Sequence, residues 1–241
     1  MSKKIPAGMA NNDVNAEQGS AQTRTVKGGK SRNKIKAGVL KLLNSQSYRA
    51  LRVVDVTQEA GVATGLFYHY FKDLPSLVEE VLSDYVADVA DSKSIEQGIE
   101  KGDWYQRIYA YNYRVALSYA NRPGLMRNLL QLADEQPSFS RLLRNNFVEQ
   151  LKWLVTSMPH LFEGSQQSEH ERLMIVYTLS ASAEVLLRDY YINQVGALVE
   201  EELSVDDIAE LLSSLFYRGL FLENPPQEKL VHFKQLSTLK R

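Results

Sequence analysis

Polar, aromatic and basic side chains occur at helical spacing between residues 64 and 72. If this segment is a helix, Phe67, Phe71 and Leu74 fall at positions i, i+4 and i+7 and point to one side. The other side carries hydroxyl, imidazole and ammonium groups, which can bind phosphate oxygens and base edges. Such a side suits a groove with phosphates on its walls better than plain water. Its residues are Thr64, Gly65, Tyr68, His69 and Lys72.

A second short helix is expected just before this segment, at residues 53–60, with one apolar side turned to a core. Gly61 follows it, at a point where a chain leaving a helix often needs a positive φ. Thr64 can cap or begin the next helix, because its hydroxyl can accept from free N–H groups. The pattern predicts a helix-turn-helix with 64–71 as the recognition helix. An ordinary helical hairpin has the same spacing.

The composition limits the possible classes of protein. A chain of 241 residues with 44% hydrophobic residues can fold into one or two domains with a sizeable core. It has no cysteine, which excludes disulfides, thiolate catalysis and cysteine zinc sites and fits a reducing cytosol. No apolar run is long enough to span a membrane, and the N-terminal lysines lack an apolar signal region. We therefore expect a cytoplasmic protein with no membrane partner.

The net charge of −1 hides an asymmetry along the chain. Residues 1–72 contain 12 Lys/Arg and 4 Asp/Glu, whereas the remaining residues contain 16 and 25. A basic end beside the helix-turn-helix fits binding to a polyanion, although a basic tail that only aids solubility is the alternative. Residues 1–29 have almost no large apolar residues and are expected to be a disordered basic arm. This arm could lie along DNA or simply be a solvated tail.

Amphipathic helices are expected along the rest of the chain, with no internal repeat and no strand-like alternation. Prolines separate several of them, since proline does not fit a helix interior. The fold class is therefore all-α, with a three-helix N-terminal helix-turn-helix head and a six-helix body. The expected helices are residues 31–47, 53–60, 64–71, 76–90, 104–121, 125–134, 138–158, 169–196 and 205–222, with a short one at 228–236.

The segments Ala60-Gly61-Val62, Gly65 and Phe67-Tyr68-His69-Tyr70-Phe71 resemble the signature of the tetracycline-repressor-like (TetR) family of bacterial transcription regulators. The resemblance covers about residues 30–77. Several positions depart from the family pattern. Thr57 replaces an alanine, Ala63 a serine and Phe67 a leucine. Leu74 replaces a phosphate-binding lysine, and Arg52 replaces a capping threonine.

The resemblance implies roles for the head residues. Tyr68 would donate its hydroxyl to a phosphate, and Thr64 would hold another. Gly65 and His69 would lie at base edges, and Leu66 would occupy a specificity position where it could meet a thymine methyl. Basic residues would contact further phosphates. These are Lys34, Arg52 and Lys72.

The resemblance also implies a homodimer and a small-molecule pocket in the body. The last two long helices would pair with those of a second copy, so that two heads read a palindromic operator in double-stranded DNA. Aromatic residues at helical spacing are candidates for the pocket wall and favour an apolar effector, although such a stripe is more often core. Glu184 and Arg188 could form a helix-surface pair, an interface pair or ligand contacts. The candidate wall consists of Trp104, Tyr111, Tyr119, Phe147 and Tyr177.

An enzyme is not expected, because the sequence has no Walker loop, no G-x-S-x-G, no G-x-G-x-x-G and no H-E-x-x-H. No cofactor or metal is expected either. The sequence predicts a ligand-responsive repressor that binds DNA, and the alternative is a helical ligand-binding or scaffold protein without DNA contact. The expected organisation is an arm at 1–29, a DNA-binding domain at 30–73, an effector-binding and dimerisation domain at 74–224, and a tail at 225–241.

Overall fold

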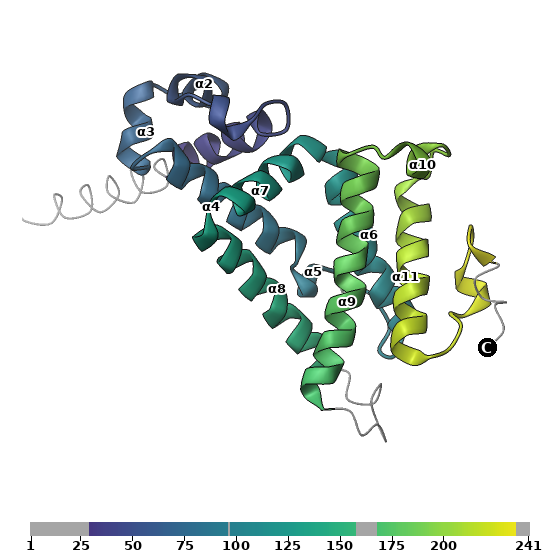
Figure 1. Ribbon diagram of the computed structural model, residues 1–241. Helices are drawn as coiled ribbons and strands as arrows, with labels where there is room; N and C mark the ends of the chain where they lie inside the picture. Colours follow the sequence, from purple (N-terminus) through teal and green to yellow (C-terminus); the bar gives the residue numbers. More distant parts are fainter. Residues whose placement is uncertain (1–28, 96, 158–167, 235–241) are drawn as a thin grey trace, which may run out of the picture.

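The structure is a computed structural model that describes residues 29–95, 97–157 and 168–234. These residues form helices and turns without a strand, which confirms the all-α class. Figure 1 shows a small N-terminal group of helices beside a larger group of longer ones. We call residues 29–71 the head and the helices from residue 74 onward the body. No helix in the described ranges is both long and apolar enough to cross a membrane.

The head contains a first helix over residues 29–42, a 3-10 turn and two short α-helices. The first helix ends before the expected residue 47, because the N–H groups of Asn44 and Ser45 bond to carbonyls three residues back and tighten the last turn. Apolar side chains of the three helices are buried together, and Tyr48 of the 3-10 turn packs against them. The remaining head elements are η1 (Tyr48–Ala50), α2 (Val53–Ala60) and α3 (Thr64–Tyr70).

Helix α4 (Leu74–Val89) runs out of the head and into the body (Figure 1). It begins earlier than the expected residue 76. Asp73 caps it by accepting a hydrogen bond from the N–H of Ser76 at 2.9 Å, and Pro75 lies in the first turn, where its missing N–H has no cost. This body helix therefore contacts both parts of the molecule.

The body is a bundle of long helices with short connecting ones. Pro123 and Pro137 do more than end the preceding helices, because each is the first residue of the next. Helix α11 packs chiefly on α6 and also on α9. The body helices after α4 are α5 (Ser92–Ile95), α6 (Trp104–Asn121), α7 (Pro123–Glu135), α8 (Pro137–Ser157), α9 (Glu169–Leu187), α10 (Gly196–Val199) and α11 (Val205–Phe221).

The helix expected over residues 169–196 is interrupted. Its α-helical part ends at Leu187 and continues as one π-helical segment, η3 (Arg188–Ile192). The chain then turns at Gln194, which has a φ of +49°. The cause is a long-range contact: the hydroxyl of buried Tyr190 accepts from the N–H of Leu203 at 2.8 Å and holds the end of η3 against the start of α11.

The C-terminal segment also differs from the expected helix at 228–236. Residues 225–233 contain the 3-10 turn η4 (Gln227–Lys229) and irregular chain, residue 234 is again 3-10 helical, and residues 235 and 236 lie outside the described ranges. Glu210 of α11 is 3% exposed and holds this segment. Its carboxylate accepts three backbone N–H bonds, which satisfies a charge that burial would otherwise destabilise. The donors are Val231 at 2.9 Å, His232 at 3.0 Å and Phe233 at 2.6 Å.

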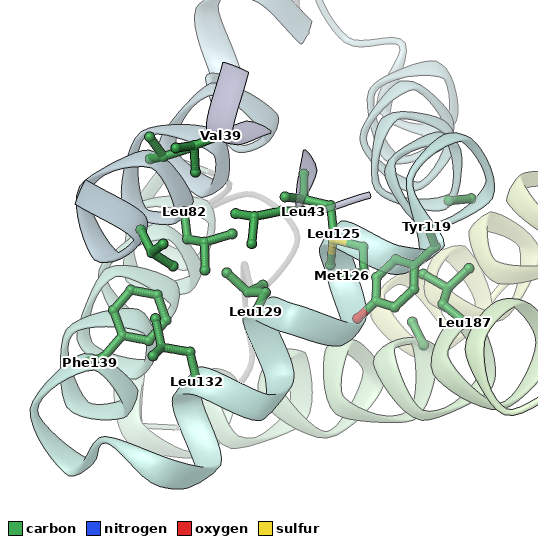
Figure 2. Packing of buried hydrophobic residues seen from close by; sticks show 14 of the residues in the cluster. Val39, Leu43, Leu82, Tyr119, Leu125, Met126, Leu129, Leu132, Phe139 and Leu187 are labelled. Atoms are coloured by element: carbon green, nitrogen blue, oxygen red, sulfur yellow. The ribbon is translucent and has the colours of Figure 1, made fainter. Parts of the chain in front are cut away.

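One hydrophobic core runs without interruption from the head into the body (Figure 2). Leu43 of the first helix lies beside Leu82 of α4 and Leu125 of α7 in this core. Leu129 and Leu132 continue it along α7 toward Phe139 of α8. Since these side chains are almost fully buried, the head is packed onto the body through both α4 and α7.

Candidate nucleic-acid interface

The turn between α2 and α3 has the geometry of a helix-turn-helix. Gly61 has a φ of +63° and a ψ of +41°, as its place after the helix predicts. The N–H of Val62 donates to the carbonyl of Thr57 at 3.0 Å, and the N–H of Gly61 donates to the carbonyl of Gln58 at 3.1 Å. These bonds end α2 and direct the chain into α3 within three residues.

Two phenylalanines fix the orientation of α3. Phe67 is fully buried and Phe71, directly after the helix, is 6% exposed, with their ring centroids 5.8 Å apart. The Arg32 guanidinium lies 5.0 Å from the Phe71 ring centroid, which adds a cation–π contact from the first helix. With this side buried, the opposite side of α3 must face outward.

The outward side brings together the residues that the sequence analysis selected. Tyr68 is 63% exposed, and Leu66 is half-buried beside the exposed residues. The Tyr68 ring is held edge-on against Phe67, at 5.2 Å between centroids, so its hydroxyl is carried away from the core. We call this outward side the recognition surface; it consists of the exposed residues Thr64, Gly65, Tyr68, His69 and Lys72.

Thr64 does not cap α3, contrary to one expectation. Ala63 occupies the cap position without a side-chain hydrogen bond, and Thr64 is the first helical residue. The hydroxyl oxygen of Thr64 lies 3.2 Å from the hydroxyl oxygen of Thr57. Thr57 is 1% exposed, and its hydroxyl donates to the carbonyl of Val53 at 3.0 Å. Threonine at position 57 therefore gives a polar link between the two helices, where alanine would give none.

Arg52 lies at the cap position of α2, and its guanidinium is paired with Asp55. Its Nε and Nη2 atoms donate to the two carboxylate oxygens at 3.0 and 2.8 Å, and its backbone N–H donates at 3.1 Å. The hydrogen bond from Arg52 holds the pKa of the Asp55 carboxyl below its usual range. The positive charge of Arg52 is therefore balanced locally, although 74% of its side chain is exposed.

The basic residues of the first helix divide into two groups, which the sequence did not reveal. Lys34 is exposed, whereas Arg32 and Lys36 face α4. Glu80 accepts from Arg32 Nη2 at 2.6 Å and from Lys36 Nζ at 2.8 Å, and Lys36 also pairs with Asp84. Burial alone lowers the pKa of Lys36, but the hydrogen bonds to Asp84 and Glu80 outweigh it and raise the pKa. These pairs join the first helix to α4.

A cavity of about 430 Å³ lies in the body between α4, α6, α7, α8, α9 and α11. Four of the five aromatic candidates line it: Tyr111, Tyr119, Phe147 and Tyr177. Trp104 does not line it and instead lies at the start of α6, with the Arg107 guanidinium 4.9 Å from its ring centroid.

The cavity wall also contains charged residues. Glu184 and Arg188, one helical turn apart, both line it, together with Asp134 and Arg144. The Nε atom of Arg188 lies 3.9 Å from Asp189, and the carboxylate of Glu184 faces two tyrosines. Burial raises the pKa of the Tyr111 and Tyr119 hydroxyls, and the neighbouring Glu184 adds to this effect. In the described ranges, no cluster of His, Asp and Glu is placed to hold a metal ion.

Comparisons with known proteins agree with the geometry of the head. Residues 37–81 match the family described as bacterial regulatory proteins, tetR family. No protein of curated function matches the sequence. A transcriptional-regulator structure from Pseudomonas aeruginosa PAO1 has a TM-score of 0.60 and 15% identity, covering 79% of this chain and 90% of that one.

Two further structures have the same fold. A TetR-family transcriptional regulator from Bordetella parapertussis 12822 has a TM-score of 0.55 and 15% identity, covering 81% of this chain and 98% of that one. A TetR family protein from Vibrio parahaemolyticus has a TM-score of 0.52 and 21% identity, covering 76% and 96%. At these identities the likeness concerns the fold.

An all-helical chain whose head carries a helix-turn-helix with an outward polar recognition helix belongs to the class of DNA-binding proteins. The family match narrows this class. Residues 37–81 match the DNA-binding segment of the tetR family of bacterial regulatory proteins, which supports a transcriptional regulator of this kind. Regulators of this family are DNA-binding transcription factors and not enzymes.

The turn geometry predicts opposite effects for two glycine substitutions. Gly61→Ala should lower the free energy of unfolding by about 1–2 kcal/mol, because a Cβ at positive φ is strained even though nothing lies within 4 Å of it. Gly65→Ala should be neutral or stabilising by up to about 1 kcal/mol, since Gly65 is helical and its Cβ would also meet open space. Urea unfolding of the full chain, followed by circular dichroism, measures both. Equal stabilities would contradict the assigned turn.

Proposed function

We propose that the protein binds a palindromic operator as a homodimer and represses transcription until a lipophilic effector occupies the body cavity. The observation that carries the DNA-binding part is the recognition surface. Its donors face outward because Phe67 and Phe71 hold the other side of α3 in the core. The repressor role rests on the usual mode of the family.

In this proposal α3 enters the major groove, and its residues divide between phosphates and bases. The exposed hydroxyl of Tyr68 donates to a phosphate, while Gly65 and His69 lie at base edges. Thr64 contacts the backbone at the start of the helix, and half-buried Leu66 meets a thymine methyl from the side. The lack of a side chain at Gly65 permits close approach of the backbone.

Phosphate binding by cations is assigned chiefly to Lys34 and Lys72. Both are exposed, and within the described part of the chain neither has a recorded ion pair. Arg52 remains a candidate, but it must first exchange Asp55 for a phosphate. That exchange reduces its net contribution, because the ion pair given up offsets the one gained.

Salt titration tests the DNA contacts. Each lysine that neutralises one phosphate contributes about 0.9 to the slope of log K against log salt concentration. Lys72→Ala and Lys34→Ala should each reduce the slope by about that amount, whereas Tyr68→Phe should weaken binding by about 1.5–3 kcal/mol with the slope nearly unchanged. Fluorescence anisotropy with labelled duplex at several salt concentrations measures both quantities.

Lys101→Ala is the matched control, because Lys101 is an exposed lysine in the turn before α6 and should leave the slope unchanged. An operator for these titrations comes from selection of genomic fragments by the purified protein. If duplex binding is indifferent to salt and to all three head substitutions, the protein is a helical ligand-binding or scaffold protein and the DNA contacts are wrong.

The dimer is assigned to an apolar face formed by α9 and α11. Met174 and Val185 of α9 are 52% and 46% exposed, and Leu215 of α11 is 47% exposed. The two helices approach closely, since a Cβ on Gly219 would lie 2.9 Å from the Leu179 side chain. Exposed apolar side chains gathered on two adjacent helices are typical of a surface that a second copy covers.

A charge on this face should break the dimer. Leu215→Glu should raise the dimer dissociation constant on the order of 100-fold or more, because each two-fold interface would bury two unpaired carboxylates. Sedimentation velocity over a concentration series measures the change. Leu142→Glu is the control, since Leu142 is 42% exposed on α8 and should leave assembly unchanged. A wild-type protein that sediments as a monomer at micromolar concentration would refute the interface.

The effector is assigned to the body cavity, whose size of about 430 Å³ lies within the range of small-molecule sites. Its lining is mostly aliphatic and aromatic, with Glu184 and Arg188 on one wall. Asp134 of α7 and Arg144 of α8 add further charged groups, so this composition favours a lipophilic ligand that also carries polar groups. Helix α4 lines the cavity with Tyr85 and Val86 and also belongs to the head support, so occupancy can be transmitted along it.

Filling the cavity should weaken the binding of lipophilic molecules. N-phenyl-1-naphthylamine should fluoresce on binding the wild type, and Ala181→Trp should weaken this binding on the order of tenfold or more, because an indole from α9 would occupy the ligand volume. Ala87→Trp is the control, at an exposed α4 position outside the cavity lining. Equal fluorescence titrations for both variants and the wild type would place the probe elsewhere and contradict the assignment.

A further inference from the structure

Helix α7 holds the connection between the first helix and α2 through a buried asparagine. Asn128 is 4% exposed, and its Nδ2 donates to the carbonyls of Leu43 at 2.7 Å and Gln46 at 3.0 Å. Its Oδ1 accepts from the N–H of Tyr48 at 2.7 Å. One side chain of the body thus satisfies three backbone groups of the head where the first helix has ended.

This position requires an amide. A carboxylate of the same shape would place acceptor oxygens against two carbonyl oxygens, and an apolar side chain would leave three buried or partly buried backbone groups without this partner. The carbonyl of Gly124 in the same helix also lies 3.0 Å from Nδ2, and because the amide has only two N–H groups, one of them is shared between two carbonyls. The contact is therefore specific for asparagine and independent of the surrounding apolar packing.

A second contact lies at the start of α7, where backbone meets backbone. A Cβ built on Gly124 would lie 2.0 Å from the carbonyl oxygen of Asn44, so any other residue would push the connection away. The N–H of Leu125 points to the Asn44 side chain, with 3.4 Å between N and Oδ1. Here the need for glycine comes from close approach and not from a positive φ.

A third contact lies at the other end of α7. Glu135 accepts from Arg49 Nη2 at 2.8 Å and from Arg49 Nε at 3.1 Å, and the Tyr48 hydroxyl also donates to it. The hydrogen bond from Tyr48 holds the pKa of the Glu135 carboxyl below its usual range. Gly124 and Glu135 are separated by roughly 16 Å along a helix that rises 1.5 Å per residue. Contacts spread over that length resist rotation of the head.

We propose that Asn128, Gly124 and Glu135, which we call the α7 clamp, fix the angle of each head on the body and thereby set the spacing between half-sites that the dimer accepts. None of the three lies on the recognition surface, so the clamp is a positioning device and does not read bases. The proposal rests on the dimeric, palindrome-binding function above.

The reason is geometric. A dimer interface fixes the two bodies relative to each other, and only the body-to-head joints then decide where the recognition helices lie. Helix α4 provides one support, through the ion pairs of Arg32 and Lys36 with Glu80. The α7 clamp provides the second, and two supports on different helices remove the hinge freedom that one support leaves. Loss of the clamp should let each head pivot.

The test uses duplexes that carry the selected half-site twice, with the spacer changed one base pair at a time, and the full-length protein. The wild type should prefer one spacing over its neighbours by about tenfold or more, the usual scale of a misplaced base contact. Asn128→Asp and Gly124→Ala should each reduce this preference to about two- to threefold while the half-site sequence preference stays unchanged. Glu135→Gln should reduce it less, because it keeps the shape of the side chain.

Arg127→Ala is the matched control, since Arg127 is the exposed neighbour of Asn128 on α7 and donates to the body carbonyl of Ile192. Its spacing preference should equal that of the wild type. Circular dichroism melts identify variants that are unfolded; Glu135→Gln, a substitution of an exposed residue, keeps the test possible if Asn128→Asp does not fold.

Two failures are distinguishable. If the wild type is selective for spacing and the folded clamp variants are equally selective, the clamp contributes only stability and the proposal is overturned. If the wild type itself binds all spacings equally, the proposal that a dimer binds a palindromic operator fails, and the positioning role fails with it.

Discussion

Burial of Phe67 and Phe71 is the constraint on which the DNA-facing surface depends. One large ring in the seven-residue helix α3 and a second directly after it leave α3 only one orientation, because turning the helix would expose them. The assignments on the recognition surface follow from that orientation. The left-handed turn at Gly61 and the Thr57–Thr64 hydroxyl pair hold the helix in place along its length, but neither could replace the rings.

Much of this arrangement could be predicted from the sequence, because it depends on short-range patterns. The spacing of the phenylalanines, the glycine after α2 and the alternation of apolar and polar faces all act within a few residues. The fold class, the recognition helix and the outward side of α3 were predicted correctly for that reason. The roles of the individual DNA contacts and of the pocket residues stay predictions, as do the domain boundaries.

The features that sequence analysis missed depend on partners distant in the chain. The end of α9 at Leu187 depends on Tyr190 and a backbone N–H beyond the next helix. The C-terminal segment is irregular because Glu210, buried in α11, takes its N–H groups. Trp104 fits the aromatic stripe of α6 but lies too near the start of that helix to line the cavity. The helical period gives the side of a helix on which a residue lies, but it does not give how far along that helix the neighbouring helices begin.

The charged residues of the head show most clearly that sequence analysis misses partners distant in the chain. The head is strongly basic in sequence, but several of its cations are paired with carboxylates that hold the fold together: Arg32 and Lys36 with Glu80, Arg49 with Glu135, and Arg52 with Asp55. Three of these four pairs join the head to the body, and the pair of Arg52 with Asp55 lies within the head. Because a paired cation must give up its carboxylate before it can bind a phosphate, the proposed phosphate contacts are assigned chiefly to the exposed Lys34 and Lys72. The basic excess therefore serves two purposes, fixing the head on its two supports and binding DNA, and the sequence alone does not divide it between them.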